Sequence, residues 1–136
     1  MYNPFLVNFS TIFYCMFNFF NKYTNNHKLS RNYCSSIHII CCLFLPILKY
    51  YYNNDYYYKI NVLISIGYFI FDSIYILLYN NYNVFNLCML YHHIAISYLV
   101  SFDHNIYKTD TNLLLGEISN IPGNIIYYCI HSNNNK

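Results

Sequence analysis

The stretch INVLISIGYFIFDSIYILLY, residues 60–79, decides the fold class of this chain. It is twenty residues long and carries one charged side chain, Asp72. A helix that crosses the hydrocarbon core of a bilayer needs about 20 consecutive, mainly apolar residues. The strands of a membrane barrel would instead alternate apolar and polar side chains, which this stretch does not do. It therefore predicts a transmembrane helix.

Further apolar stretches of similar length lie on both sides, at residues 4–20, 35–52, 84–102 and 112–131. We expect an all-α fold, a polytopic transmembrane bundle of about five helices within a range of four to six. A basic link at residues 21–32 would separate the first two helices. The expected units are residues 1–29 (first transmembrane helix and basic loop), 30–131 (the bundle) and 132–136 (a polar tail).

The composition favours an integral membrane protein over a soluble one. Charged residues make up 9% of the 136 residues, and apolar residues 57%. A soluble globular domain has roughly 25% charged residues, which it needs to cover its surface. The net charge of +2 and the absence of a basic stripe argue against binding to nucleic acid. The predicted location is a membrane that the chain crosses several times.

The sequence predicts no cofactor and no metal site. It contains three glycines and no Gly-rich phosphate loop, and no nucleophile elbow marks a Ser or Cys hydrolase. The histidines are too few and too scattered for the repeated boxes of membrane di-iron enzymes. The cysteines form no C-x-x-C pair, and most lie in apolar stretches where a free thiol behaves as a small hydrophobe: Cys15, Cys34, Cys41, Cys42, Cys88 and Cys129.

Several polar side chains lie inside the expected spans, where an ionisable group costs at least about 2.5–3.5 kcal/mol. We expect them to form a polar internal cavity made of Ser35, His38, Tyr68, Asp72 and Glu117. The simpler interpretation is that these groups satisfy one another as polar contacts between helices. The alternative is a centre for acid–base chemistry, because a histidine near a carboxylate can accept and release a proton.

The pair His92-His93 lies in the middle of the fourth expected span. Adjacent residues of a helix point about 100° apart, so the two rings cannot face the same neighbour. We expect His93 to face the interior, beside Asp72 or Glu117. Both histidines are candidate catalytic residues.

Short stretches in a fixed order resemble the TLC domain, which is shared by TRAM, Lag1-type ceramide synthases and CLN8. They are RNYCSSIH (residues 31–38), SIGYFIFD (65–72), YHH (91–93) and EISNIP (117–122), and the likeness covers about residues 30–128. The chain looks closest to small multi-pass members of the family. It departs from ceramide synthases in the acidic residues that follow the paired histidines, where only Asp103 and Asp110 are candidates, and in its C-terminal end, where the family usually continues.

The resemblance implies residence in an endoplasmic reticulum-like membrane and a role in sphingolipid or phospholipid homeostasis. One alternative is an acyl-CoA-dependent N-acyltransferase of the ceramide synthase kind, in which His92 and His93 would be the essential pair. A further alternative is an inactive, truncated structural remnant, so the sequence leaves open whether the chain is an enzyme. The expected partners are membrane lipids, with acyl-CoA and a second copy of the chain as further candidates and no nucleic acid.

Overall fold

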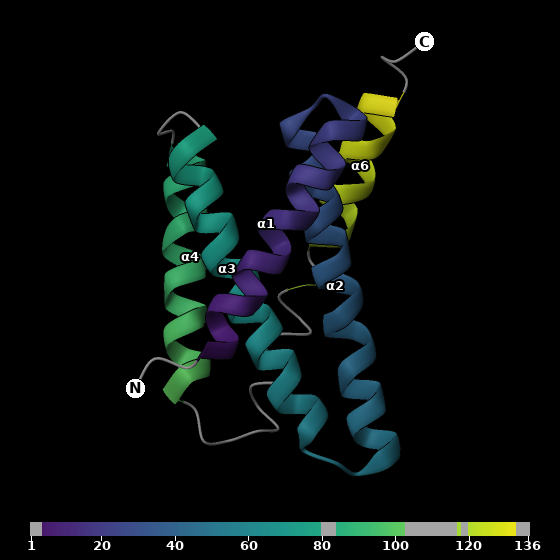
Figure 1. The fold of residues 1–136 in the computed structure, drawn as a ribbon, viewed down its shortest axis with the longest axis vertical. Coiled ribbons are helices and arrows are strands. Elements are labelled where there is room, and N and C mark those ends of the chain that lie inside the picture. Colours follow the sequence, from purple (N-terminus) through teal and green to yellow (C-terminus); the bar gives the residue numbers. More distant parts are fainter. Residues whose placement is uncertain (1–3, 80–83, 103–116, 118–119, 133–136) are drawn as a thin grey trace.

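A computed structural model describes residues 4–79, 84–102, 117 and 120–132 of the chain (Figure 1). The described residues form α-helices joined by short turns, and no strand occurs among them. The all-α class is therefore confirmed. The helices are α1 (Pro4–Thr24), α2 (His27–Tyr52), α3 (Tyr56–Tyr79), α4 (Val84–Phe102) and α6 (Asn120–Ser132).

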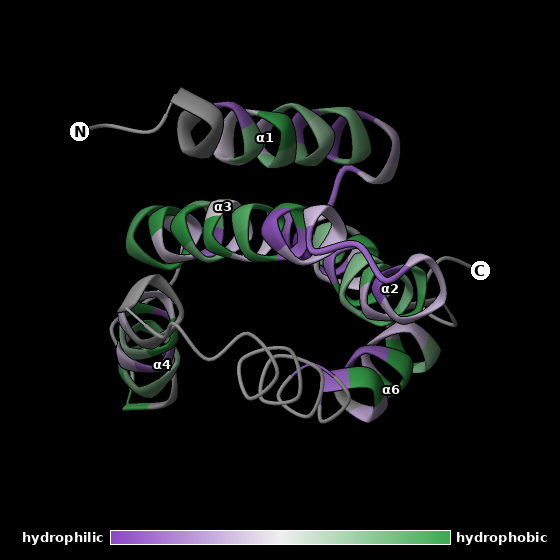
Figure 2. Cartoon of the chain, turned by 90° about the horizontal axis from the view of Figure 1, so that it is seen from below, coloured by the Kyte–Doolittle hydropathy of each residue, from purple (hydrophilic) through white to green (hydrophobic). Residues whose placement is uncertain are grey.

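The helices are arranged around the antiparallel pair α2 and α3. Seen end-on, α1 lies on one side of this pair, and α4 and α6 lie on the other (Figure 2). Helix α4 packs against α3, α6 packs against α2, and α1 contacts both central helices. Side chains of α2 and α3 that point toward α4 and α6 are therefore covered by helices from the second half of the chain.

The predicted helix positions agree with the structure in part. Helix α4 has the expected bounds, and α3 begins at Tyr56 instead of residue 60. Glu117, which is helical, falls inside the expected span 112–131, and α6 ends one residue beyond it, at Ser132. Residues 112–116 and 118–119 lie outside the described part of the chain. Residues Asp103 and Asp110 lie outside it as well.

The expected basic link at residues 21–32 is wrong, because α2 begins at His27 and only Asn25 and Asn26 separate it from α1. Asn25 has a φ of 49°, the left-handed conformation that asparagine tolerates and that ends a helix. The side-chain oxygen of Asn26 accepts hydrogen bonds from the backbone N–H groups of Lys28 and Leu29, at 3.0 and 3.1 Å. This N-cap starts α2 early, and Arg31 therefore lies in a helix and not in a loop.

Two of the described helices, α2 with 26 residues and α3 with 24, are long and apolar enough to cross a membrane. Only 22% of the apolar window of α2 is buried inside the protein, and 44% of that of α3. A core helix of a soluble protein would be mostly buried, so the exposed apolar surface of α2 sets it apart from such a helix.

Helices α1 and α3 come into close backbone contact at Gly67. A Cβ atom built on Gly67 would lie 2.5 Å from Cβ of Phe9 and 3.1 Å from the backbone nitrogen of Ser10. Only a glycine leaves room for this backbone of α1. Small residues at such crossings are typical of helix packing in membranes, where close backbone contact supplies the attraction.

Candidate functional site

A seam of polar side chains runs along the interface between α2 and α3. On α3, its members recur at alternating intervals of four and three residues, which places them on one face of the helix. These members are Asn61, Ser65, Tyr68, Asp72 and Tyr75, and all are buried. Each of the last four contacts a polar or charged residue of α2. The amide of Asn61 has no hydrogen-bond partner within the described part of the chain.

At one end of the seam, Arg31 binds Asp72 with both arms of its guanidinium group. Nε donates to Oδ1 at 2.5 Å and Nη2 donates to Oδ2 at 2.6 Å. The guanidinium also lies over the ring of Tyr75, 5.0 Å from its centre, and the hydroxyl of Tyr75 is 2.7 Å from Nδ1 of His27. A bidentate pair of this kind fixes the orientation of both side chains. The carboxylate of Asp72 is 1% exposed, so its hydrogen bonds to Arg31 replace those it would make with water.

His38 is the centre of the seam and is completely buried. Its Nε2 lies 3.2 Å from Oγ of Ser65 and 3.3 Å from Sγ of Cys42, and these two atoms lie 3.4 Å from each other. Its Nδ1 lies 3.5 Å from Oε2 of Glu117. The ring of Tyr68 stacks on the imidazole at a centroid distance of 4.2 Å and an angle of 15°. Oε2 of Glu117 is thus close to Nδ1 without forming a hydrogen bond to it, and Tyr68 covers one face of the ring.

The carboxylate of Glu117 is held on the other side by α6. Nδ2 of Asn120 donates to Oε2 of Glu117 at 3.3 Å, and Nδ2 of Asn124 donates to Oγ of Ser35 at 3.3 Å. The second of these bonds connects α6 to α2. Ser35 therefore contacts α6, whereas His38, on the same face of α2, contacts Ser65 and Cys42.

The paired histidines separate, as their angular spacing predicts. His93 is buried, its Nδ1 lies 3.6 Å from Oδ2 of Asp72, and its ring stacks on Phe69 at 5.1 Å. His92 is exposed, and the two ring centres are 5.9 Å apart. Only His93 joins the buried polar cluster, so the pair does not converge on one point.

The structure thus collects His38, Tyr68, Asp72, His93 and Glu117 in one region and leaves His92 outside it. Sequence reasoning missed three members of this region, Arg31, Ser65 and Cys42. The sequence pattern predicts a loop at Arg31 and a packing role for Cys42. The spacing of four residues from His38 to Cys42 was the signal that could have found the thiol, because such residues lie one above the other on a helix.

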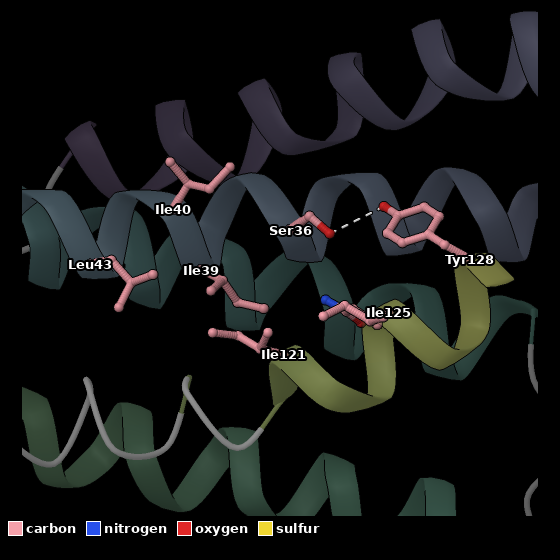
Figure 3. Close-up of a pocket in the computed structure, with 8 residues that line it drawn as sticks. Ser36, Ile39, Ile40, Leu43, Ile121, Ile125 and Tyr128 are labelled. Carbon is pink, nitrogen blue, oxygen red and sulfur yellow. Dashed lines mark hydrogen bonds between the residues drawn. The ribbon is translucent and has the colours of Figure 1, made fainter.

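An open groove of about 220 Å³ lies between α2 and α6 (Figure 3). Aliphatic side chains form its walls, and Ile39 of α2 lies next to Ile121 of α6. At one end, Oγ of Ser36 lies 3.1 Å from the hydroxyl of Tyr128. A second groove, of about 310 Å³, lies between α3 and α4 and includes His93 in its lining. Both grooves suit an apolar chain that carries a polar end.

The arrangement has the parts of acid–base chemistry. His38 has a carboxylate beside one ring nitrogen and a thiol and a hydroxyl beside the other, which is the order in which a histidine base is oriented and used. Within the described residues, no group of three or more His, Cys, Asp and Glu side chains is placed to hold a metal ion. His38 can take part in proton transfer, and Cys42 and Ser65 carry nucleophilic side chains beside it.

Comparison with known proteins gives no relative on which to base a function. No family model, no curated protein and no solved structure matches the chain.

Proposed function

We propose that this chain is a multi-pass membrane protein of the TLC type that acts in membrane lipid homeostasis, in an endoplasmic reticulum-like membrane. The observation that carries the proposal is a set of polar side chains buried, beside an aromatic core of Phe13, Phe17, Phe69 and Phe71, beneath an exposed apolar surface. The largest fully buried side chains are polar or are cysteines: His38, Asn61, Asp72, Cys34, Cys42, Ser30 and Ser65.

The outside of the described helices has the opposite character. Large apolar side chains are exposed along α2, α3, α4 and α6, among them Phe44 at 60% and Leu78 at 71%. In water, apolar side chains exposed to this extent would promote aggregation. In a bilayer they would instead contact the lipid tails, which are apolar as well. Buried ionisable groups inside such a bundle are costly and mark functional positions.

The four stretches that resemble the TLC domain also supply the polar cluster. Arg31 and His38 come from the first stretch, and Asp72 comes from the second. His93 comes from the third and Glu117 from the fourth. Segments far apart in the sequence thus bring their polar residues to one place, and this supports the view that the resemblance reflects a shared site.

Lipids are the proposed ligands because both grooves are lined mainly by apolar side chains and open at the side of the bundle. The groove between α2 and α6 borders the His38 region, and the groove between α3 and α4 reaches His93. A lipid tail in the groove between α3 and α4 would bring its polar end to His93.

The first test is alkaline carbonate extraction of membranes from cells that express the chain. We expect the protein to stay in the pellet, because only detergent can replace the lipid around its apolar surface. A folded protein released into the supernatant would refute the membrane assignment.

The second test is lipid profiling of the same cells with two variants. His93→Gln changes the buried histidine and His92→Gln changes its exposed neighbour, so the two form a matched pair. We expect the wild-type chain and His92→Gln to shift the sphingolipid or phospholipid profile in the same way, and His93→Gln to lose the shift. A profile that the wild-type chain leaves unchanged would refute the role in lipid homeostasis.

A further inference from the structure

We propose that Cys42 is an acyl-accepting nucleophile, with His38 as its base and Glu117 as the residue that positions this base. The acyl donor is a long-chain acyl thioester, and this class of donor rests on the proposed function in membrane lipids. The thiol would carry the acyl group as a covalent intermediate before its transfer to a second substrate.

The order of atoms around His38 supports this role. Sγ of Cys42 lies 3.3 Å from Nε2, and Oε2 of Glu117 lies 3.5 Å from Nδ1. An activated nucleophile needs a base within hydrogen-bond reach and a third group that orients the base, in this order. Distances of this kind are often looser in the absence of substrate and shorten in the reacting complex. The three side chains come from α2 and from the segment before α6, far apart in the sequence.

A purely structural role would not require this arrangement. Cys34 lies on the same helix, is equally buried, and directs its thiol to the backbone oxygen of Phe13 at 3.8 Å. It is a cysteine that simply packs. Cys42 instead shares a histidine nitrogen with Ser65, and the histidine has a carboxylate behind it. Only the second environment can remove a proton from sulfur and stabilise the imidazolium that forms.

The proposed steps balance without a further reagent. His38 takes the thiol proton of Cys42 through Nε2, and the thiolate attacks the carbonyl carbon of the acyl thioester. The new C–S bond forms, the donor thiolate leaves, and it takes the proton from His38. An amine or hydroxyl of the acceptor lipid then attacks the acyl group on Cys42, His38 takes the acceptor proton, and this proton returns to the departing sulfur.

The groove between α2 and α6 is the proposed place for the acyl chain. Its lining includes Ile39 and Leu43, which directly follow His38 and Cys42 in α2 (Figure 3). Cys42 itself is completely buried and is not part of this lining, so the donor carbonyl reaches sulfur only when the groove widens. Donors that partition into the membrane should therefore react, whereas water-soluble thiol reagents should not.

The test uses the full chain in lipid nanodiscs with an alkyne-tagged palmitoyl-CoA. The adduct is mapped by mass spectrometry and treated with neutral hydroxylamine, which cleaves thioesters and spares ordinary esters. We expect a hydroxylamine-sensitive adduct on Cys42. His38→Gln should slow its formation by about 100-fold, in the range of general base catalysis. In the Cys34→Ala variant, Cys42 should be labelled at the wild-type rate.

The outcomes separate this inference from the proposed function. The position of the adduct on the wild-type chain tests the role of Cys42 even if a variant fails to fold. An unmodified Cys42, with label only on the exposed Cys15, Cys88 or Cys129, would overturn the role of Cys42. A hydroxylamine-resistant adduct on Ser65 would overturn it as well. Neither result bears on the proposed function, which is tested separately by carbonate extraction and lipid profiling. If those two tests give the contradicting outcomes, the proposed function is refuted whatever the labelling of Cys42.

Discussion

Replacement of Asp72 by asparagine is the sharpest test of the polar seam. The substitution keeps the shape of the side chain and removes its charge, so Arg31 loses a bidentate partner whose two bonds measure 2.5 and 2.6 Å. Loss of one partner of a buried ion pair costs about 3–5 kcal/mol. The side chain of Arg31 keeps 26% of its exposure and can recover some solvation. We therefore expect the lower end, about 3 kcal/mol of unfolding free energy, or roughly 100-fold in the folding equilibrium.

The complementary variant Arg31→Met leaves the carboxylate of Asp72 without its cation at 1% exposure. It should cost at least as much as Asp72→Asn, because Asp72 has less access to solvent. The double variant contains neither charge, and its destabilisation should fall short of the sum of the single variants by about 2–3 kcal/mol. The free energies would be measured by titration with sodium dodecyl sulfate in mixed micelles, followed by circular dichroism. Strictly additive effects would refute the seam as a coupled unit.

Three further perturbations follow from the packing. Gly67→Ala should cost about 1–3 kcal/mol in the same unfolding assay, because its Cβ would meet Phe9 at 2.5 Å; a cost below about 0.5 kcal/mol would argue against the close helix crossing. His93→Ala should destabilise by about 1–3 kcal/mol and the exposed His92→Ala by less than about 0.5 kcal/mol; equal effects would place both rings in the same environment. Asn26→Ala should lower stability by about 0.5–2 kcal/mol and delay the start of α2, seen as faster amide exchange at Lys28; unchanged exchange would contradict the cap.

The helices could be predicted from the sequence because their signal is local. An apolar run of about 20 residues has to satisfy its own backbone, and a helix does so within the run. The expected span 84–102 has the bounds of α4 for this reason. The start of α2 could not be found in this way, because the polar residues 27–34 dilute the apolar run. A single N-cap at Asn26 decides where that helix begins.

The members of the candidate site were predictable only in part. His38, Asp72 and Glu117 stood out because an ionisable group within an apolar run is costly and needs a reason. Arg31 and Cys42 did not stand out. An arginine near a predicted span boundary is ordinary, and a cysteine in an apolar run usually packs as a hydrophobe. Their roles depend on the neighbours that α3 and the start of α6 place beside them.

By itself, the sequence determined that the chain is helical and that it carries more apolar surface than it can bury, because composition and run length act residue by residue. Only the tertiary structure decided which polar groups meet. Helix α2 runs antiparallel to α3, and this register pairs Arg31 with Asp72 and His38 with Ser65. A shift of one residue along a helix turns a side chain by about 100° and would separate these pairs. Contact between distant segments is a property of packing, and no local pattern encodes it.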